Sequence, residues 1–469
     1  MTGSTVDAVQ HGTDLTTGSI PRHLVAFSVP MLLGSALQTA YSLVNAFWVG
    51  NRLGTDAMVA VTVSFPVLFV LTAVAGGLTL ATTVLVSQAY GAKNYSEVRR
   101  VINNSVVLVG AISLVCVLLG QLAAAPVLRL IRTPPSALQL SVTYLRLLLF
   151  TMPPTFGIFL LAAALRGVGD SKTPLYFQAV SLAVAFVLDP LLMFGWLGFP
   201  RLGLNGTAVA TLLAQAAAVV GLAYFLARKN HIASPDWLHL RADAETTWLT
   251  LKIGVPSMVQ QALVSVGMMV MTGLVNTFGR EGAAAFGIAL RIDQLAFMPA
   301  MTIGMAVSSL VGQNVGARRF DRASAVLRWG LVMSVGMTSV ASALALAVPA
   351  LLLSPFSRDP HVINIGTGYL RIAAFMYLGF AIMFVSNGVI NGSGHTLETT
   401  AFTLLSLWGV RIPLAAHLAR SLHRIEGIWY AMLAGVAFGA ALSVVYYATG
   451  LWKRPVRRPH EAPALGGTD

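Results

Sequence analysis

Asp189 is the residue of this chain whose type and position point most clearly to chemistry. It stands in the run Phe-Val-Leu-Asp-Pro at residues 186–190, and it is the only carboxylate well inside the apolar segments of the first half. A charged carboxylate is costly in lipid, so an acid in such a place is typical of a site that binds a proton or another cation. A structural role is the alternative, because Asp189 precedes Pro190 and could satisfy backbone groups freed where a proline distorts a helix.

Polar side chains recur at helical spacing in three apolar segments of this half. They are Gln38, Tyr41, Ser42 and Asn45 in the first segment, Gln178, Ser181 and Asp189 in the fifth, and Thr207, Thr211 and Gln215 in the sixth. Such spacing puts each set on one face of an α-helix. Hydrocarbon satisfies no hydrogen-bond donor, so these faces should meet one another or a water-filled cavity. They predict either a polar pocket around Asp189 or hydrogen bonds that only hold the helices together.

The elements that carry these residues are long enough to span a membrane. The chain has 469 residues, of which 56% are hydrophobic and 10% charged, and its mean hydropathy is +0.76. Residues 24–50 form a run of 27 apolar or small polar positions, which as an α-helix would measure roughly 40 Å. Twelve such stretches recur along the chain. We therefore predict an all-α membrane protein with twelve transmembrane helices.

The net charge of +13 indicates a membrane topology and not a nucleic-acid partner. Basic residues stand at the ends of the apolar segments and not along one face or one tail. When the loops are assigned alternately with the N-terminus inside, 18 Lys and Arg residues fall inside and eight outside. The positive-inside rule then predicts that both termini are cytoplasmic. The same basic surface suits anionic membrane lipid.

The two halves of the chain repeat each other at an offset of 225 or 226 positions. The paired landmarks are residues 28–30 and 254–256, residues 87–93 and 312–318, and residues 165–170 and 390–395. Six spans in each half make both copies enter the membrane in the same direction, with a substrate path between them. The predicted parts are an N-terminal tail (1–22), a first six-helix lobe (23–227), a cytoplasmic linker (228–247), a second six-helix lobe (248–453) and a C-terminal tail (454–469).

In order, spacing and duplication, these landmarks resemble the MATE (multidrug and toxic compound extrusion) transporters, and within them the bacterial DinF-like branch. The stretches that carry the resemblance are residues 30–54, 87–94, 165–174, 187–190, 312–317 and 387–394. The resemblance implies two pseudo-symmetric bundles that form a V in the bacterial inner membrane, as a multi-pass protein. It also implies antiport, in which H⁺ or Na⁺ enters while an organic compound, often a cationic or amphipathic drug, toxin or metabolite, leaves.

The resemblance also implies a place for cation coupling in the first lobe. The pattern of the DinF-like branch has an acid in helix one, an Asn and an acid four residues apart in helix five, and a Thr in helix six. Asp189 matches the acid of helix five and Thr211 matches the threonine of helix six. Asn45 stands at the place of the acid of helix one, and Ala185 at the place of the asparagine. Two of the four elements are therefore kept and two are replaced.

The replacement at Asn45 leaves the coupling ion open. Two neighbouring carboxylates raise each other's proton affinity through repulsion, and with Asn45 that contribution is missing. Burial of Asp189 alone would then have to favour the protonated form, or else the site stays ionised and prefers a metal cation. The carboxylate of Asp189, the amide oxygen of Asn45 and the hydroxyl of Thr211 are hard oxygen ligands of the kind that suit Na⁺. Altered coupling is a third possibility.

Further side chains are predicted to line a substrate cavity or to form an internal polar network. They are Gln38, Tyr41, Gln178, Ser181, Thr207, Gln260, Met268, Arg291, Asp293 and Asn387. Methionines adapt to varied ligands but also fill gaps in ordinary packing. Some branches of the family carry acids in helices seven and ten, where this chain has apolar residues near Val264 and Phe380. We therefore expect no second ion site in the second lobe.

Other functional classes lack their sequence signals. The chain has no phosphate-binding Gly-x-x-x-x-Gly-Lys-Ser/Thr loop and no clustered metal ligands, so we expect neither an enzyme nor a cofactor. A flippase for lipid-linked precursors, or an exporter of anionic metabolites, would need clustered cations, and only Arg146, Arg291 and Arg411 are available, spread over both halves. A channel would need a continuous polar ring, whereas the duplication favours alternating access by a monomer.

Overall fold

The computed structural model describes residues 12–454, and this part of the chain is helical with no strands. Parts of the two predicted tails, residues 1–11 and 455–469, lie outside the described residues. Twelve helical segments are long and apolar enough to cross a membrane, which confirms the predicted class and number. In the first half the helices are α1 (Ile20–Arg52), α2 (Thr55–Gly91), α3 (Tyr95–Leu130), α4 (Pro135–Leu149), α5 (Met152–Gly167), α6 (Lys172–Phe194) and α7 (Leu204–Arg228).

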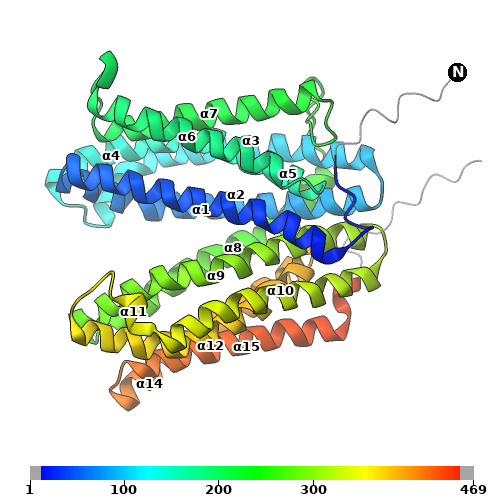
Figure 1. The fold of residues 1–469 in the computed structure, drawn as a ribbon. Coiled ribbons are helices and arrows are strands. Elements are labelled where there is room, and N and C mark those ends of the chain that lie inside the picture. The colour runs from blue at the N-terminus through cyan, green and yellow to red at the C-terminus, as the bar shows by residue number, and fades with distance from the viewer. Residues whose placement is uncertain (1–11, 455–469) are drawn as a thin grey trace, which may run out of the picture.

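The second half repeats this arrangement. Its elements are α8 (Ala244–Asn276), α9 (Gly279–Gly316), α10 (Phe320–Ala347), α11 (Pro349–Leu353), α12 (Pro360–Gly392), α13 (Thr396–Leu404), the π-helix η3 (Leu405–Arg411), α14 (Ile412–Leu422) and α15 (Glu426–Thr449). Short 3₁₀ turns follow α6 and α15 as η2 (Trp196–Gly198) and η4 (Leu451–Lys453). Figure 1 shows the two halves as separate bundles, as the predicted fold class requires.

Prolines explain why two of the twelve spans are not single α-helices. The fourth span, Pro135–Gly167, is divided between α4 and α5, and α5 restarts with a proline in its first turn. Proline lacks the N–H that would continue the helical hydrogen bonds, but it is tolerated where a helix begins. The eleventh span, Thr396–Leu422, passes through η3, and α14 likewise has a proline in its first turn. Wider π-type turns of this kind relieve the clash between a proline ring and the preceding turn.

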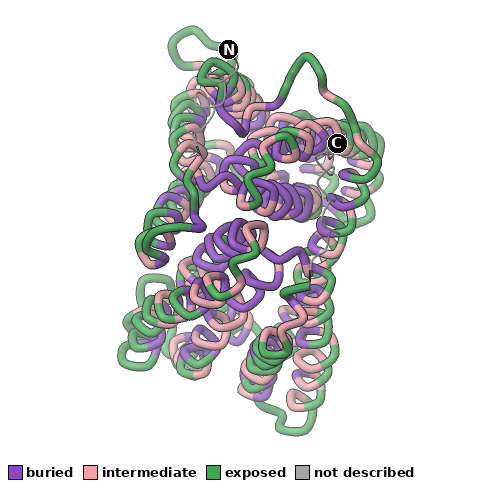
Figure 2. Tube along the Cα trace, turned by 90° about the vertical axis from the view of Figure 1, so that its right-hand side faces the viewer, coloured by how far each residue is buried: buried purple, intermediate pink, exposed green. Residues whose placement is uncertain are grey.

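The bundles meet at the end of the molecule where the described chain begins and ends, and diverge toward the other end (Figure 1). Gly91 and Gly316, which are equivalent in the repeat, lie in this contact. A Cβ atom on Gly91 would overlap the carbonyl of Gln313, and one on Gly316 would overlap the carbonyl of Gln88. Only glycine allows backbones to approach this closely. The side chain of Gln88 adds a 3.0 Å hydrogen bond to the carbonyl of Gly392. Figure 2 shows buried residues where the two bundles face each other.

Helix α1 belongs to both bundles. Near its start, Leu24 and Phe27 are buried in one apolar cluster with Ile303 and Leu310 of α9. Farther along, the same helix packs against α6 of the first bundle. A 33-residue helix measures roughly 50 Å, so one rigid element can contact one lobe at one end and the other lobe deep in the membrane.

The segment between α7 and α8 is attached to α3 of the first bundle. The backbone N–H of Asp236 donates to the side chain of Asn103 at 2.9 Å. Asp243 caps α8 by accepting from the N–H of Thr246 at 2.8 Å, and it pairs with Arg100 at 2.7 Å. The hydrogen bond from Arg100, followed by those from Thr246, lowers the pKa of the Asp243 carboxyl.

Asp243→Ala is therefore expected to destabilise the protein by about 1–2 kcal/mol at neutral pH, the usual effect of losing an N-cap. The pKa of Asp243 is lower in the folded protein than in the unfolded chain. Its contribution to the free energy of unfolding is therefore full above about pH 4, and it is lost as the pH falls from there toward the pKa of the folded state. Apparent melting temperatures of detergent-purified wild type and variant, measured at pH 7 and pH 3, check this. Asp243→Asn, which keeps a capping oxygen, should lose less. Equal melting temperatures for all three proteins at pH 7 would contradict the prediction.

Candidate functional site

Asp189 is buried between α1 and α6, with 2% of its surface exposed. Its Oδ2 atom accepts two hydrogen bonds from α1, one from the hydroxyl of Tyr41 at 2.9 Å and one from the amide nitrogen of Asn45 at 3.1 Å. Its Oδ1 atom is buried and has no hydrogen-bond partner among the described residues. One carboxylate oxygen is thus saturated by neutral donors, while the other lacks any.

Local sequence explains why α1 and α6 present these groups to each other. Tyr41 and Asn45 are four residues apart, so they lie one above the other on a helix and reach the same carboxylate oxygen. On α6, Ala185 stands one turn before Asp189 and is 4% exposed. Its methyl group adds no polar atom there. The site therefore depends on a single acid and two neutral donors.

Thr211 and Thr207 of α7 form no hydrogen bond with Asp189 among the described residues. Thr211 lies beside the hydroxyl of Tyr41. Thr207 is 2% exposed, donates to the carbonyl of Leu204 at 3.0 Å and lies near the hydroxyl of Tyr144 on α4. Tyr144 in turn lies close enough to Asp189 to interact with its charge. Both threonines therefore lie in an outer layer around the acid.

Sequence reasoning missed Tyr144, although the repeat contained a signal for it. The tripeptide Tyr-Leu-Arg occurs at residues 144–146 and again at residues 369–371, which is 225 positions later. The first tyrosine lies near Asp189 in one lobe, and the second, Tyr369, hydrogen-bonds to a buried aspartate in the other. A tyrosine kept at equivalent positions of the two copies marks a polar contact in each lobe.

The other predicted residues of the first lobe lie toward the start of α6. The side-chain nitrogen of Gln178 is 3.5 Å from both the side-chain oxygen of Gln38 and the carbonyl oxygen of Gly34 on α1. Gln38 is exposed and Ser181 is buried. These side chains continue the contact between α1 and α6, and no hydrogen bond joins them directly to Asp189 in the described residues.

In the second lobe the structure separates the predicted residues. Met268 and Arg291 are exposed, whereas Gln260 donates to Thr403 at 2.5 Å and to the carbonyl of Thr399 at 3.2 Å. Asn387 accepts from Ser443 at 2.8 Å inside the bundle. Gln260 and Asn387 thus connect helices of the same lobe.

Asp293 is the buried acid of the second lobe, at 2% exposure. The hydroxyl groups of Tyr369 and Tyr377 on α12 both donate to its carboxylate, that of Tyr377 at 2.7 Å. Phe286 and Trp429 pack around Tyr369 and seal the group from solvent. Arg291, two residues away, is exposed, because side chains two apart point to different sides of an α-helix.

Tyr377→Phe is expected to destabilise the protein by about 1.5–3 kcal/mol, because it removes one hydroxyl donor from a buried charged acceptor. The apparent melting temperature of the detergent-purified variant should fall by several degrees. Tyr430→Phe makes the same chemical change at an exposed position of α15 and should leave the melting temperature unchanged. A Tyr377→Phe protein as stable as the wild type would show that Asp293 does not depend on this donor.

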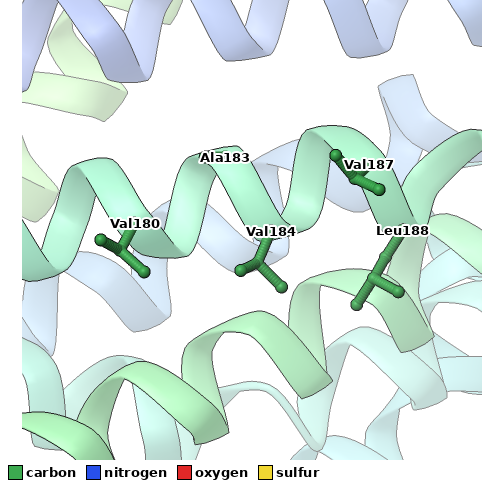
Figure 3. A pocket seen from close by; sticks show the side chains of 5 residues that line it. All are labelled: Val180, Ala183, Val184, Val187 and Leu188. Atoms are coloured by element: carbon green, nitrogen blue, oxygen red, sulfur yellow. The ribbon is translucent and has the colours of Figure 1, made fainter.

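A surface hollow on α6 beside the site is apolar. It has a volume of about 400 Å³ and is lined by Val180, Ala183, Val184, Val187 and Leu188 of α6. Figure 3 shows these residues along one helix, and the last of them, Leu188, directly precedes Asp189 in the chain. They offer no polar group to a cation, and in a bilayer such a surface suits lipid chains.

The chemistry of the donor set at Asp189 fits a proton or one small monovalent cation. Among the described residues, no group of three or more His, Cys, Asp or Glu side chains is arranged to hold a metal. Asn45 presents its amide nitrogen to the carboxylate, so its oxygen does not share a ligand shell with Oδ2 in this arrangement. The open Oδ1 atom is the position that can accept a proton or contact a cation.

Comparison with known proteins places these features in a family. The family model described as MatE matches residues 30–191 and 256–416. The chain is 32% identical over 441 residues to "Probable multidrug resistance protein YoeA" of Bacillus subtilis, covering 93% of this chain and 95% of that protein. It is 25% identical over 433 residues to the "FAD transporter" of Shewanella oneidensis, covering 90% and 93%. The fold matches the outward-facing structure of a multidrug resistance MATE family transporter with a TM-score of 0.87 at 21% identity, covering 94% and 98%.

Proposed function

The chain belongs to the MATE family, whose members are membrane transporters and not enzymes. We propose that it is a secondary active antiporter, which exports small organic compounds in exchange for a cation bound at Asp189. The observation that carries this proposal is the state of that carboxylate. It is buried, and within residues 12–454 its hydrogen bonds come only from neutral donors and one of its oxygens has no partner. An acid in this state gains from taking up a positive charge.

We propose the proton as the coupling ion, with Na⁺ as the alternative. Sodium binding needs several oxygen ligands around one centre. Among the described residues the nearest amide presents its nitrogen to Asp189, and Thr211 makes no hydrogen bond to the carboxylate. A proton on Oδ1 needs no further ligand. Transport by the protein in proteoliposomes, measured once with an imposed pH gradient and once with an imposed Na⁺ gradient, distinguishes the two ions.

Helix α1 supports a physical route from Asp189 to the movement of the lobes. Tyr41 and Asn45 on this helix bind the carboxylate, while Leu24 and Phe27 near its start pack with the second lobe. Charging or neutralising Asp189 changes the strength of its two hydrogen bonds. Such a change alters the relative free energy of two arrangements of α1, which is what cation-driven alternating access requires.

The substrate that fits this proposal is a cationic or amphipathic organic compound, which the ionised Asp189 would favour by charge. A second candidate is an anionic metabolite, because one relative carries the name FAD transporter. Ethidium and FAD, tested separately, distinguish the two classes. Sensitive bacteria that express the chain should accumulate less ethidium, and an uncoupler should abolish the difference. Ethidium accumulation equal to that of cells without the chain, together with FAD export, would favour the second candidate.

A further inference from the structure

Residues 12–18, which precede α1, lie between the two lobes at the end where the bundles meet. The N–H of Thr13 donates to the carbonyl of Val168, which follows α5 of the first lobe, at 2.9 Å. The N–H of Leu15 donates to the side-chain oxygen of Gln313 on α9 of the second lobe, also at 2.9 Å. Asn314 donates back to the carbonyl of Leu15 at 3.3 Å. Residues 12–18, here termed the clasp, thus bind both lobes at once.

Two arginines of the second lobe hold the carbonyl groups of the clasp. Arg319 donates to Thr16 at 2.9 Å, and Arg322 donates to Thr17 and Gly18 at 2.6 and 2.8 Å. Hydrogen bonds from a charged donor are stronger than those between neutral groups. These contacts fix the second half of the clasp to α10 and to the turn before it.

The clasp also carries a charge that is shared between the lobes. Burial acts to raise the pKa of Asp14, but hydrogen bonds from Thr16 and the positive charges of Lys93 and Arg319 outweigh it and lower the pKa. Lys93 follows α2 of the first lobe, and Arg319 precedes α10 of the second. The carboxylate of Asp14 is therefore ionised between one cation from each side.

An apolar anchor completes the contact. Leu15 is 2% exposed and packs in one cluster with Leu310 and Val311 of α9 and Val326 of α10. Gln313, which accepts from Leu15, also donates to the carbonyl of Gly167 in the first lobe at 2.9 Å. Leu15 and its partners thus close the contact between the two lobes, here termed the seam, by burial as well as by hydrogen bonds.

We propose that the clasp is a state-dependent lock, which holds the lobes together in the arrangement observed and must release when they part at this end. This inference rests on the proposed function, because only a transporter with alternating access has to open this seam. A hydrogen bond is lost within about 1 Å of stretching, so Thr13 cannot stay bound to Val168 while Leu15 stays bound to Gln313 in separated lobes. The contacts of the clasp therefore add to the free-energy difference between the two states.

The test measures the distance between the lobes directly. Spin labels are attached to Ala92→Cys and Asp321→Cys, two exposed positions of opposite lobes beside the seam, after Cys116, the only native cysteine, is changed to Ala. Double electron–electron resonance is recorded for the full chain in lipid nanodiscs. Leu15→Ala removes the apolar anchor, and Arg319→Ala with Arg322→Ala removes the charged donors. Arg318→Ala, an exposed arginine beside Arg319, is the matched control.

We expect each clasp variant to raise the ratio of separated to closed lobes by about tenfold, which corresponds to about 1.4 kcal/mol, while Arg318→Ala leaves it unchanged. Two variants of different chemistry are used so that a folding defect in one, seen by size-exclusion chromatography, does not prevent the test. If folded clasp variants give the wild-type distance distribution, the lock is refuted. If the wild type itself shows one short distance at every pH and Na⁺ concentration, alternating access at this seam is refuted instead.

Discussion

Asp189→Asn is expected to abolish cation-driven export while leaving the fold intact. A difference of one pH unit stores about 1.4 kcal/mol per proton, so the wild type should concentrate a substrate about tenfold across the membrane per coupled proton, and the variant should reach a ratio of about one. The amide oxygen of the variant can still accept from Tyr41 and Asn45, which bind the native carboxylate at 2.9 and 3.1 Å. The substitution therefore removes the ionisable carboxyl of residue 189 and keeps its two hydrogen bonds.

Ethidium accumulation in proteoliposomes with an imposed pH difference measures this ratio. Asp170→Asn is the matched control, because it makes the same change at the start of the same helix, where Asp170 accepts from the N–H groups of Lys172 and Thr173. The control should accumulate ethidium as the wild type does. Full accumulation by Asp189→Asn would show that the coupling cation binds elsewhere.

Asn45→Asp is expected to strengthen proton coupling and to move export to higher pH. The variant places a second carboxyl where Asn45 now donates to Asp189 at 3.1 Å. Two carboxylates at this separation share a proton and hold it more tightly than one, through mutual repulsion of the ionised forms. The pH of half-maximal export should therefore rise by about one unit or more, the size of effect seen for such carboxylate pairs.

The pH profile of ethidium transport, measured from pH 5 to 9 in the same vesicles, checks this prediction. Asn230→Asp makes the same change at an exposed position after α7, outside the membrane-spanning segments, where water screens the charge. Its profile should move much less. A profile of Asn45→Asp that coincides with that of the wild type, or with that of Asn230→Asp, would contradict direct contact between residue 45 and the coupling acid.

Local patterns in the sequence predicted the parts of the site that lie on single helices. The spacing of Tyr41 and Asn45 put them on one face of α1, and the structure brings that face to Asp189. The same reasoning could not predict that Thr211 lies beside Tyr41 and makes no hydrogen bond to the acid. Its position depends on how α7 packs against α6, α5 and α4, which periodicity within one helix does not specify. Tyr144 lies on a fourth helix and was recognisable only by comparing the two copies of the repeat.

Hydropathy predicted the twelve spans, because each span must satisfy its own backbone hydrogen bonds in lipid and therefore forms a long apolar helix. The spacing of the paired landmarks predicted the duplication. The sequence did not predict contacts between distant parts of the chain. Leu15 binds Gln313 although 298 residues separate them, and nothing in the polar segment before α1 signals that partner. The π-helix η3 was also unexpected, since a proline predicts a distortion of a helix without predicting its form.

Cation displacement on substrate binding tests the central claim most directly. Ethidium is added to the purified protein in weakly buffered detergent solution, proton release is followed with a pH indicator, and release of bound ²²Na⁺ is followed in parallel. The wild type should release about one cation for each ethidium bound, as reciprocal linkage at one shared carboxyl requires, and Asp189→Asn should bind ethidium with no release. Equal release by both proteins, or ethidium binding to the wild type without any release, would contradict the role of Asp189.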